Sequence, residues 1–326
     1  MNGDNNNESV NSDADEAKLN AAADLESEGK YAEAVEIYRE LAEEGNENAQ
    51  YTLGICHMDG VGVAKDEAEA ANWFRRAAGL GMASAQHMLG TCYTEGIGVD
   101  KNDAEAAKWF RRASEQEDAD ELYRMGYGYA FGIGFDVDLV EAVKWFHKAA
   151  DREHAGAQHA LGIHYSSGTG VIENKFEAAE WYRRAAEQGL ALAQNALGEC
   201  YFYAIGVGKN ETEAAKWFRK AAEQNEADAQ CNLGVCYSYG EGVEKDEAEA
   251  FKWFLKSAER GNPAAQFNLG NCYARGEGVE TDETEALKWY RKSAEQGFEA
   301  AQAKIDSILN PETQINGENT GSEVKQ

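Results

Sequence analysis

The chain contains seven tryptophans, and they recur at a constant interval of 36 residues. A fixed period of this length is the signature of a tandem repeat array. Each copy has the pattern of a helix, a glycine-containing loop and a second helix, and such a unit can bury its apolar face only against a neighbour. The sequence therefore predicts an all-α fold, an α/α superhelical solenoid of helix–loop–helix repeats. The tryptophans that set the period are Trp73, Trp109, Trp145, Trp181, Trp217, Trp253 and Trp289.

Alignment on the tryptophans divides the chain into seven full units without insertions. Ahead of them, residues 16–46 have the pattern of a shorter helix pair that caps the array, and residues 299–309 form a capping helix at the other end. The polar segments 1–15 and 310–326 contain few large apolar residues, so we expect disordered tails there. The predicted units are 47–82, 83–118, 119–154, 155–190, 191–226, 227–262 and 263–298.

Two sets of small residues recur inside the helices. Glycine stands at one position of every first helix, as at Gly54, although glycine costs about 1 kcal/mol in a helix interior relative to alanine. Alanine recurs at one phase of the second helix, as at Ala70. We expect glycine to pack against this alanine so that the two backbones approach closely, with tryptophan and the aromatic residue after it filling the remaining space.

Five of the six cysteines occupy equivalent positions in their units, and only Cys231 lies out of phase. Equivalent helices of successive units are roughly 8–10 Å apart, which exceeds the Cα separation of about 7 Å that a disulfide tolerates. We therefore expect free, buried cysteines that act as small apolar side chains.

The formal net charge is −28, from 59 acidic and 31 basic side chains. Long-range repulsion of this size opposes binding to nucleic acid and to anionic membranes. No apolar run reaches the roughly 18 residues needed to cross a bilayer, and the first residues do not resemble a signal peptide. The sequence predicts a cytoplasmic protein that binds neither nucleic acid nor membrane, and it does not indicate an oligomeric state.

Two patterns suggest chemistry but have simpler explanations. Glycine pairs such as Gly60 and Gly62 precede an acidic helix start at Asp66, which would repel a phosphate, so we assign them to turns. His154, His159 and His164 are five residues apart and do not share a helical face, which argues against a metal site. No nucleophile and base stand out from the repeat. We expect no catalysis, no metal and no cofactor.

The motifs of one unit resemble a known family. Ala229-Gln230, Leu233-Gly234, Tyr237, Gly240-Glu241-Gly242-Val243 and Glu249-Ala250 with Trp253-Phe254 are similar to the Sel1-like repeat pattern, and the resemblance extends over all seven units. The resemblance implies an α/α superhelix, similar to tetratricopeptide arrays, that acts as a scaffold or adaptor for other proteins. Such arrays line their concave surface with the first helices.

One branch of that family, the Helicobacter cysteine-rich proteins, implies alternatives. Members of that branch are exported, carry disulfides between adjacent helices, and in part engage β-lactams, so a small-molecule or β-lactam-engaging enzyme and an exported virulence or surface factor remain open. The bridge positions of the branch correspond to Gln50 and Ala78 in this chain, and neither is cysteine. The chain departs from the branch at those positions.

Positions of the first helix that differ among the copies are candidates for recognition, because framework positions repeat. We predict that they bind a protein or peptide with basic and apolar residues. Three of them are aromatic at spacing i, i+4 and i+8 in the unit that departs most from the repeat, where Glu121-Leu122 replaces Ala-Gln and Gly128 replaces cysteine. Packing of these rings against a neighbouring helix is the alternative. The candidate partner-binding residues are Tyr51, His87, Glu95, Tyr123, Tyr127, Phe131, His159, Glu199, Tyr203, Tyr239 and Arg275.

Overall fold

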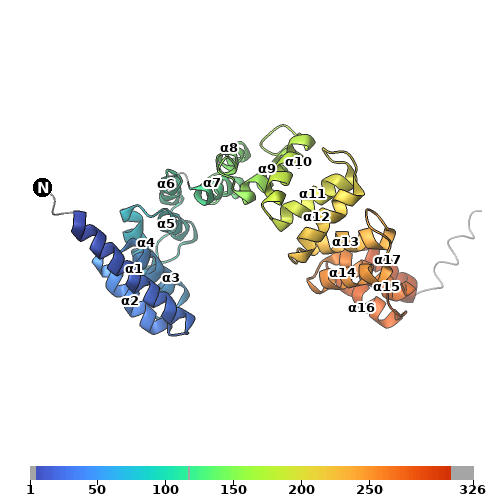
Figure 1. Cartoon of the computed structure of the whole chain (residues 1–326), viewed down its shortest axis with the longest axis horizontal. Helices are drawn as coiled ribbons and strands as arrows, with labels where there is room; N and C mark the ends of the chain where they lie inside the picture. The colour runs from blue at the N-terminus through green and yellow to red at the C-terminus, as the bar shows by residue number, and fades with distance from the viewer. Residues whose placement is uncertain (1–4, 117, 310–326) are drawn as a thin grey trace, which may run out of the picture. The chain divides into compact units, whose positions relative to one another are not determined.

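The computed structural model of the chain describes residues 5–116 and 118–309 (Figure 1). Over these residues it contains seventeen α-helices and no strands, which confirms the predicted α/α solenoid of helix pairs. The helices are α1 (Asn5–Ser27), α2 (Tyr31–Glu44), α3 (Glu47–Asp59), α4 (Glu67–Leu80), α5 (Ala83–Glu95), α6 (Asp103–Ser114), α7 (Ala119–Phe131), α8 (Leu139–Ala150), α9 (Ala155–Ser167), α10 (Lys175–Glu187), α11 (Ala191–Tyr203), α12 (Glu211–Glu223), α13 (Ala227–Tyr239), α14 (Glu247–Glu259), α15 (Pro263–Arg275), α16 (Glu283–Glu295) and α17 (Glu299–Leu309).

The chain divides into two compact units. Unit 1 comprises Met1–Ala157 with Thr169–Val171, and unit 2 comprises Gln158–Gly168 with Ile172–Gln326. Within each unit, helices that are consecutive in sequence pack against each other. No helix among the described residues is long and apolar enough to cross a bilayer.

Helix ends are set by local sequence in nearly the same way from copy to copy; in α11 alanine (Ala204) takes the left-handed position that glycine holds after the other first helices. In α4, the Asp66 carboxylate accepts hydrogen bonds from the backbone N–H groups of Ala68 and Glu69, both at 3.0 Å. Such a cap satisfies donors that have no partner inside the helix. The preceding helix α3 ends at Asp59 and is capped by Gly60, whose φ of 75° lies in the left-handed region that favours glycine. These two signals produce the predicted helix–loop–helix unit.

The nearest neighbour of each recurring glycine of the first helices is an aromatic ring; the predicted alanine contact is seen at Gly126, where an added Cβ atom would lie 3.1 Å from the carbonyl oxygen of Ala142. A Cβ atom added to Gly54 would lie 2.6 Å from Cε1 of Phe74, the residue after the tryptophan. Ala70 is fully buried on the same helix, one turn before Phe74. A Cβ atom added to any of the other six recurring glycines would also clash with the ring that faces it; the pairs are Gly90–Phe110, Gly126–Phe146, Gly162–Tyr182, Gly198–Phe218, Gly234–Phe254 and Gly270–Tyr290.

Within a compact unit, tryptophan joins one repeat to the helix pair before it. Trp253 of α14 is 8% exposed and lies in one buried cluster with Phe218 of α12. A basic side chain three residues later covers each indole, as Arg76 does at 4.3 Å from the centroid of Trp73. This cation–π contact gives the basic residues of the second helices a packing role in addition to the predicted ion pairs. The other six pairs are Trp109–Arg112, Trp145–Lys148, Trp181–Arg184, Trp217–Lys220, Trp253–Lys256 and Trp289–Lys292.

All six cysteines are buried and free, as predicted for small apolar side chains. The N-terminal helix differs from expectation, because α1 begins at Asn5 and so includes residues 5–15, which were predicted to belong to a disordered tail. No glycine or proline interrupts the sequence between Asn5 and Ser27, and a helix that has already formed extends at little further cost. Residues 1–4 and the predicted tail at 310–326 lie outside the described residues.

Candidate partner-binding site

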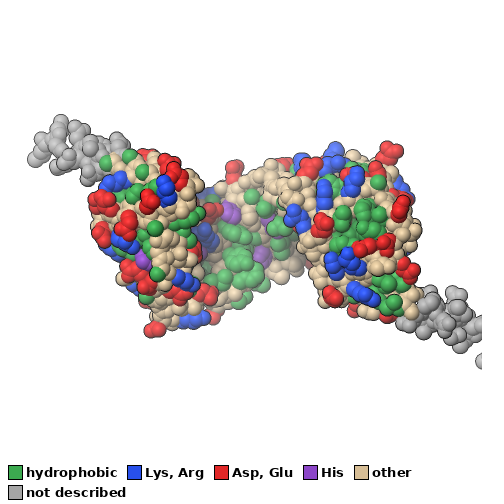
Figure 2. Space-filling model, turned by 90° about the horizontal axis from the view of Figure 1, so that it is seen from below, with side chains coloured by type: hydrophobic (Ala, Val, Ile, Leu, Met, Phe, Trp, Pro, Cys, Tyr) green, Lys and Arg blue, Asp and Glu red, His purple; other side chains and the backbone are tan. Residues whose placement is uncertain are grey.

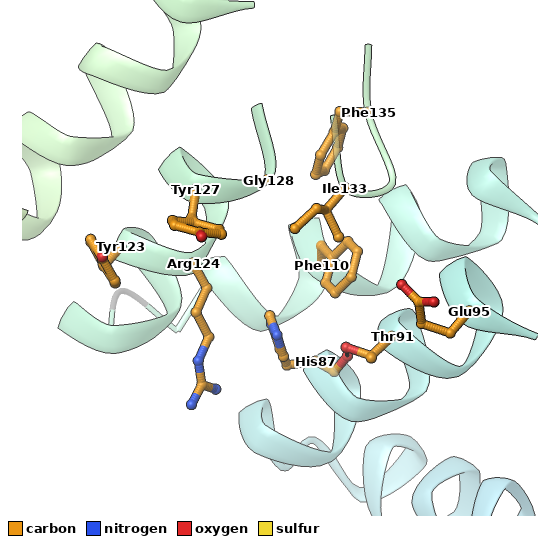
Figure 3. Close-up of a pocket in the computed structure, with 10 residues that line it drawn as sticks. All are labelled: His87, Thr91, Glu95, Phe110, Tyr123, Arg124, Tyr127, Gly128, Ile133 and Phe135. Carbon is orange, nitrogen blue, oxygen red and sulfur yellow. Dashed lines mark hydrogen bonds between the residues drawn. The ribbon is translucent and has the colours of Figure 1, made fainter. Parts of the chain in front are cut away.

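Unit 1 contains a cavity of about 340 Å³ between α5, α6, α7 and the loop that follows α7 (Figure 3). Side chains on α5 and α7 face the same space because each set is spaced at about one helical turn. The lining residues are His87, Thr91 and Glu95 from α5, Phe110 from α6, Tyr123, Arg124, Tyr127 and Gly128 from α7, and Ile133 and Phe135 from the loop.

Four of the predicted partner-binding residues therefore line one cavity: His87, Glu95, Tyr123 and Tyr127. Phe131 extends the same row by one turn of α7, and its ring centroid lies 4.3 Å from that of Tyr127. Tyr127 is 42% exposed and Phe131 is 63% exposed. The outer part of the aromatic row is thus open to solvent.

The inner end of the row is packed. The Tyr123 ring stacks on His154 with centroids 4.5 Å apart and lies 5.7 Å from the ring of Phe146. Burial raises the pKa of the Tyr123 phenol. The structure thus divides the row: Tyr123 contacts neighbouring helices, whereas Tyr127 and Phe131 present their rings to the surface.

A buried carboxylate lies behind the cavity. Glu121 is 3% exposed, at a position where the other six sequence repeats have alanine. Its carboxylate accepts a hydrogen bond from Nη1 of Arg124 at 2.6 Å and lies 3.2 Å from Nδ1 of His87. A buried carboxylate is costly unless it is paired, and both partners line the cavity. Glu121 therefore fixes two of the polar side chains of the cavity wall.

Two other departures from the repeat leave room for the cavity. Gly128 replaces the buried cysteine of other units, so no side chain projects from that part of α7. Leu122 stands where the other six repeats have a glutamine. That glutamine can hydrogen-bond to the preceding helix, as Gln86 does by donating to the carbonyl oxygen of Ala78 at 3.2 Å. Leucine has no such donor. The same sequence repeat, residues 119–154, has Phe135 where the other six repeats have valine.

Sequence reasoning missed several residues of this cavity. Arg124, Phe110, Ile133 and Phe135 were not predicted to belong to the site. Phe135 carried a usable signal, because the repeat alignment shows it as the single aromatic residue at its position. Phe110 carried none, because an aromatic residue stands at its position in every unit.

Tyr51, the remaining predicted residue of unit 1, lies on α3 and is half-buried against Phe74, with ring centroids 5.8 Å apart. It does not line the cavity.

The other predicted residues belong to unit 2. His159 on α9 is half-buried, its ring lies 5.7 Å from that of Tyr182, and burial lowers its pKa. Arg275 lies 3.5 Å from the carboxylate of Glu277. Tyr239 is 72% exposed at the end of α13.

Glu199 and Tyr203 form the most structured part of the candidate set in unit 2. The Glu199 carboxylate accepts hydrogen bonds from the amide groups of Asn195 at 3.1 Å and Asn232 at 3.3 Å. Burial raises the pKa of Glu199, and the hydrogen bonds from Asn195 and Asn232 offset part of this rise. Tyr203, one turn later on α11, is 64% exposed. The two units therefore carry separate parts of the predicted surface.

No set of three or more His, Cys, Asp and Glu side chains within the described ranges is placed to hold a metal ion. Of the three histidines considered above, His154 pairs with Asp120 at 3.0 Å and His164 is buried.

Stacked helix pairs with a constant core and a variable first-helix surface define the class of α/α repeat scaffolds. The Sel1 repeat family model matches seven successive segments of the chain, and the chain belongs to this family. The third match begins only at residue 122, which leaves residues 119–121 and thus Glu121 outside it. The matched segments are 48–82, 83–118, 122–154, 155–190, 191–226, 227–262 and 263–298.

Two solved structures are similar over most of the chain. One is c5321, a protective antigen present in uropathogenic Escherichia coli strains that displays an SLR fold, with 37% identity and a TM-score of 0.76. The match covers 93% of this chain and 66% of c5321, so the chain spans slightly less than two thirds of that protein. The other is a Sel1 repeat protein from Oxalobacter formigenes, with 33% identity, a TM-score of 0.70, and coverage of 85% of this chain and 80% of that one. A search of curated protein sequences gave no match.

Proposed function

We propose that this protein is a non-catalytic scaffold or adaptor that binds a partner polypeptide on the variable surface of its first helices. The observation that carries the proposal is the exposure of Tyr127 and Phe131, at 42% and 63%, beside a cavity lined by other residues of the same variable set. Exposed aromatic side chains next to a cavity are typical anchors for a binding partner. The fold supports this function, because repeat scaffolds present extended binding surfaces.

The partner is expected to carry basic as well as apolar residues. The chain has a net charge of −28, and an acidic field of this kind speeds the approach of a basic segment while it repels nucleic acid and anionic lipid. Acidic and basic side chains are interspersed over the charged parts of the face in Figure 2, with hydrophobic areas between them. Neither a cofactor nor a metal is required for such binding, and a cytoplasmic location stays a prediction from sequence.

The test is selection of a random peptide display library on the immobilised protein. Selected peptides are expected to be enriched in aromatic residues and in lysine or arginine, and to bind less tightly as salt rises from about 50 mM to about 300 mM. The variant Tyr127→Ala/Phe131→Ala is expected to lose most of this binding. Leu80→Ala/Val140→Ala is the matched control, because it removes two other exposed apolar side chains of the same unit, each 55% exposed. Equal losses in both variants would contradict the proposal.

A further inference from the structure

We propose that the cavity between α5 and α7 receives one aromatic or long aliphatic side chain of the partner polypeptide, and that a lysine or arginine beside this anchor residue pairs with Glu95. The inference rests on the proposed function, and it adds a specific pocket and the chemistry of the residues that the pocket selects. Its first basis is the size and lining of the cavity.

The volume of about 340 Å³ lies at the lower end of the range found for small-molecule pockets, which suits a single large side chain. Rings of Phe110, Tyr123, Tyr127 and Phe135 line it together with Ile133. An aromatic side chain buries roughly 150–250 Å² of surface, and ring-to-ring contacts add to the gain from burial. The wall is therefore suited to an apolar anchor.

The cavity is accessible to a partner from the side of the exposed row. Tyr127 belongs both to the cavity wall and to the exposed surface, and Phe131 continues that surface at a ring distance of 4.3 Å. A bound chain can therefore place its anchor against Tyr127 and continue over Phe131. Contacts of this kind exclude water around a buried anchor.

The unpaired charge at the cavity is negative. Arg124 and His87 also line it, but both pair with the buried carboxylate of Glu121. Arg111 lies over the Phe135 ring, 5.8 Å from its centroid, and is not part of the lining. Glu95 is exposed at the end of α5 and forms no ion pair within the described part of the chain. A basic neighbour of the anchor therefore has a partner at this site, whereas an acidic neighbour has none.

Several departures from the repeat pattern coincide at this cavity. Gly128 supplies space, Phe135 supplies an aromatic wall, Leu122 removes a tie between α7 and α6, and Glu121 fixes two polar wall residues. A decayed repeat would not be expected to place four substitutions at the wall of one cavity or beside it. Their coincidence indicates a pocket that was built for binding.

The test measures the fluorescence anisotropy of labelled synthetic peptides titrated with the full chain. The main probe is a short serine–glycine peptide with one tryptophan flanked by lysines. Two matched probes carry alanine in place of tryptophan, or glutamate in place of the lysines. The wild-type protein is expected to bind the main probe at least about ten-fold more tightly than the alanine probe. No preference for tryptophan over alanine would overturn the inference.

Variants place the binding in the cavity. Gly128→Cys restores the residue type of other units and puts a Cβ atom 3.3 Å from the Phe135 ring, so it should weaken binding of the main probe about ten-fold. Thr91→Leu fills the cavity from the opposite wall and serves as the second blocking variant. The matched control is Gly79→Cys, because a Cβ atom there has nothing within 4 Å, and it should bind as the wild type does. Glu95→Gln should reduce the preference for lysine over glutamate, leaving only the part due to the net charge of the chain, and should keep the dependence on tryptophan.

The outcomes separate this inference from the proposed function. If Gly128→Cys and Thr91→Leu both bind the main probe like the wild type, the anchor pocket is wrong. Loss of library-selected peptides in Tyr127→Ala/Phe131→Ala would then still support a scaffold that binds on its exposed row. If that double variant also binds normally, the proposed function fails as well.

Discussion

The same substitution, glycine to alanine, is expected to have opposite effects at two positions of the first repeat. A Cβ atom at Gly54 on α3 would lie 2.6 Å from Cε1 and 2.8 Å from Cδ1 of Phe74. The Phe74 ring is fully buried, so it cannot turn away into solvent. Overpacking of this kind costs about 1–3 kcal/mol, and the gain in helix propensity from glycine to alanine offsets up to about 1 kcal/mol of it. We expect Gly54→Ala to lower the free energy of unfolding by about 1–2 kcal/mol.

Gly79 on α4 provides the matched control. It is exposed, and a Cβ atom there meets nothing within 4 Å. Gly79→Ala should therefore raise the free energy of unfolding by about 0.4–1 kcal/mol, because alanine restricts the unfolded chain and adds no clash. Urea unfolding followed by far-ultraviolet circular dichroism measures both variants under the same conditions.

A double-mutant cycle tests the cause. Phe74→Leu makes the facing side chain smaller, so Gly54→Ala should cost less in that background than in the wild type. If Gly54→Ala instead stabilises the protein as Gly79→Ala does, the packing of glycine against the ring is not what fixes glycine in the first helices.

Further predictions concern the two kinds of surface. Trp181→Ala should lower the free energy of unfolding by about 3–5 kcal/mol, because the indole is buried, with 6% of its surface exposed. Tyr127→Ala should lower it by well under about 1 kcal/mol, because Tyr127 is 42% exposed. Similar losses of stability in thermal unfolding of the two variants would contradict the distinction between framework and binding surface. Glu199→Gln should stabilise the protein at pH 7, because the folded state raises the pKa of Glu199 and so disfavours its charged form, and this advantage should shrink as the pH falls towards about 4.5. The exposed Glu223→Gln is the control, and an equal pH dependence in both variants would argue against burial as the cause.

The fold was predictable because every copy repeats the same local signals. The tryptophan period and the aspartate or asparagine that caps a second helix recur in all seven repeats, and the glycine that follows a first helix recurs in all but the fifth, which has Ala204, so one pattern predicts the structure of every repeat. The partner of the recurring glycine was not predictable in the same way. Ala70 and Phe74 are one turn apart on the same face of α4, so helical phase alone cannot tell which of them meets Gly54. Only the packed structure shows that the larger residue does so.

The candidate site was predictable only in part for a related reason. Variation among the copies indicated His87, Glu95, Tyr123 and Tyr127, since this variation can be read within one helix. The cavity itself depends on side chains that meet from three helices and a loop. Its depth depends on the absence of a side chain at Gly128, and its charge on a pairing with Glu121 that joins two repeats. Neither effect is visible from the period of the sequence.

The repeat architecture explains how one unit can carry these departures. In an array, each repeat contacts only its neighbours, so the stability lost at a weakened junction is confined to that junction. The α6–α7 junction lacks the glutamine tie that Gln86 and Gln194 make to the carbonyl oxygens of Ala78 and Ala186. The glycines and rings at the centre of the repeats are unchanged on both sides of it, including Gly126 against Phe146. The repeat can therefore lose the glutamine hydrogen bond between α6 and α7 and form a pocket there while its core contacts are retained.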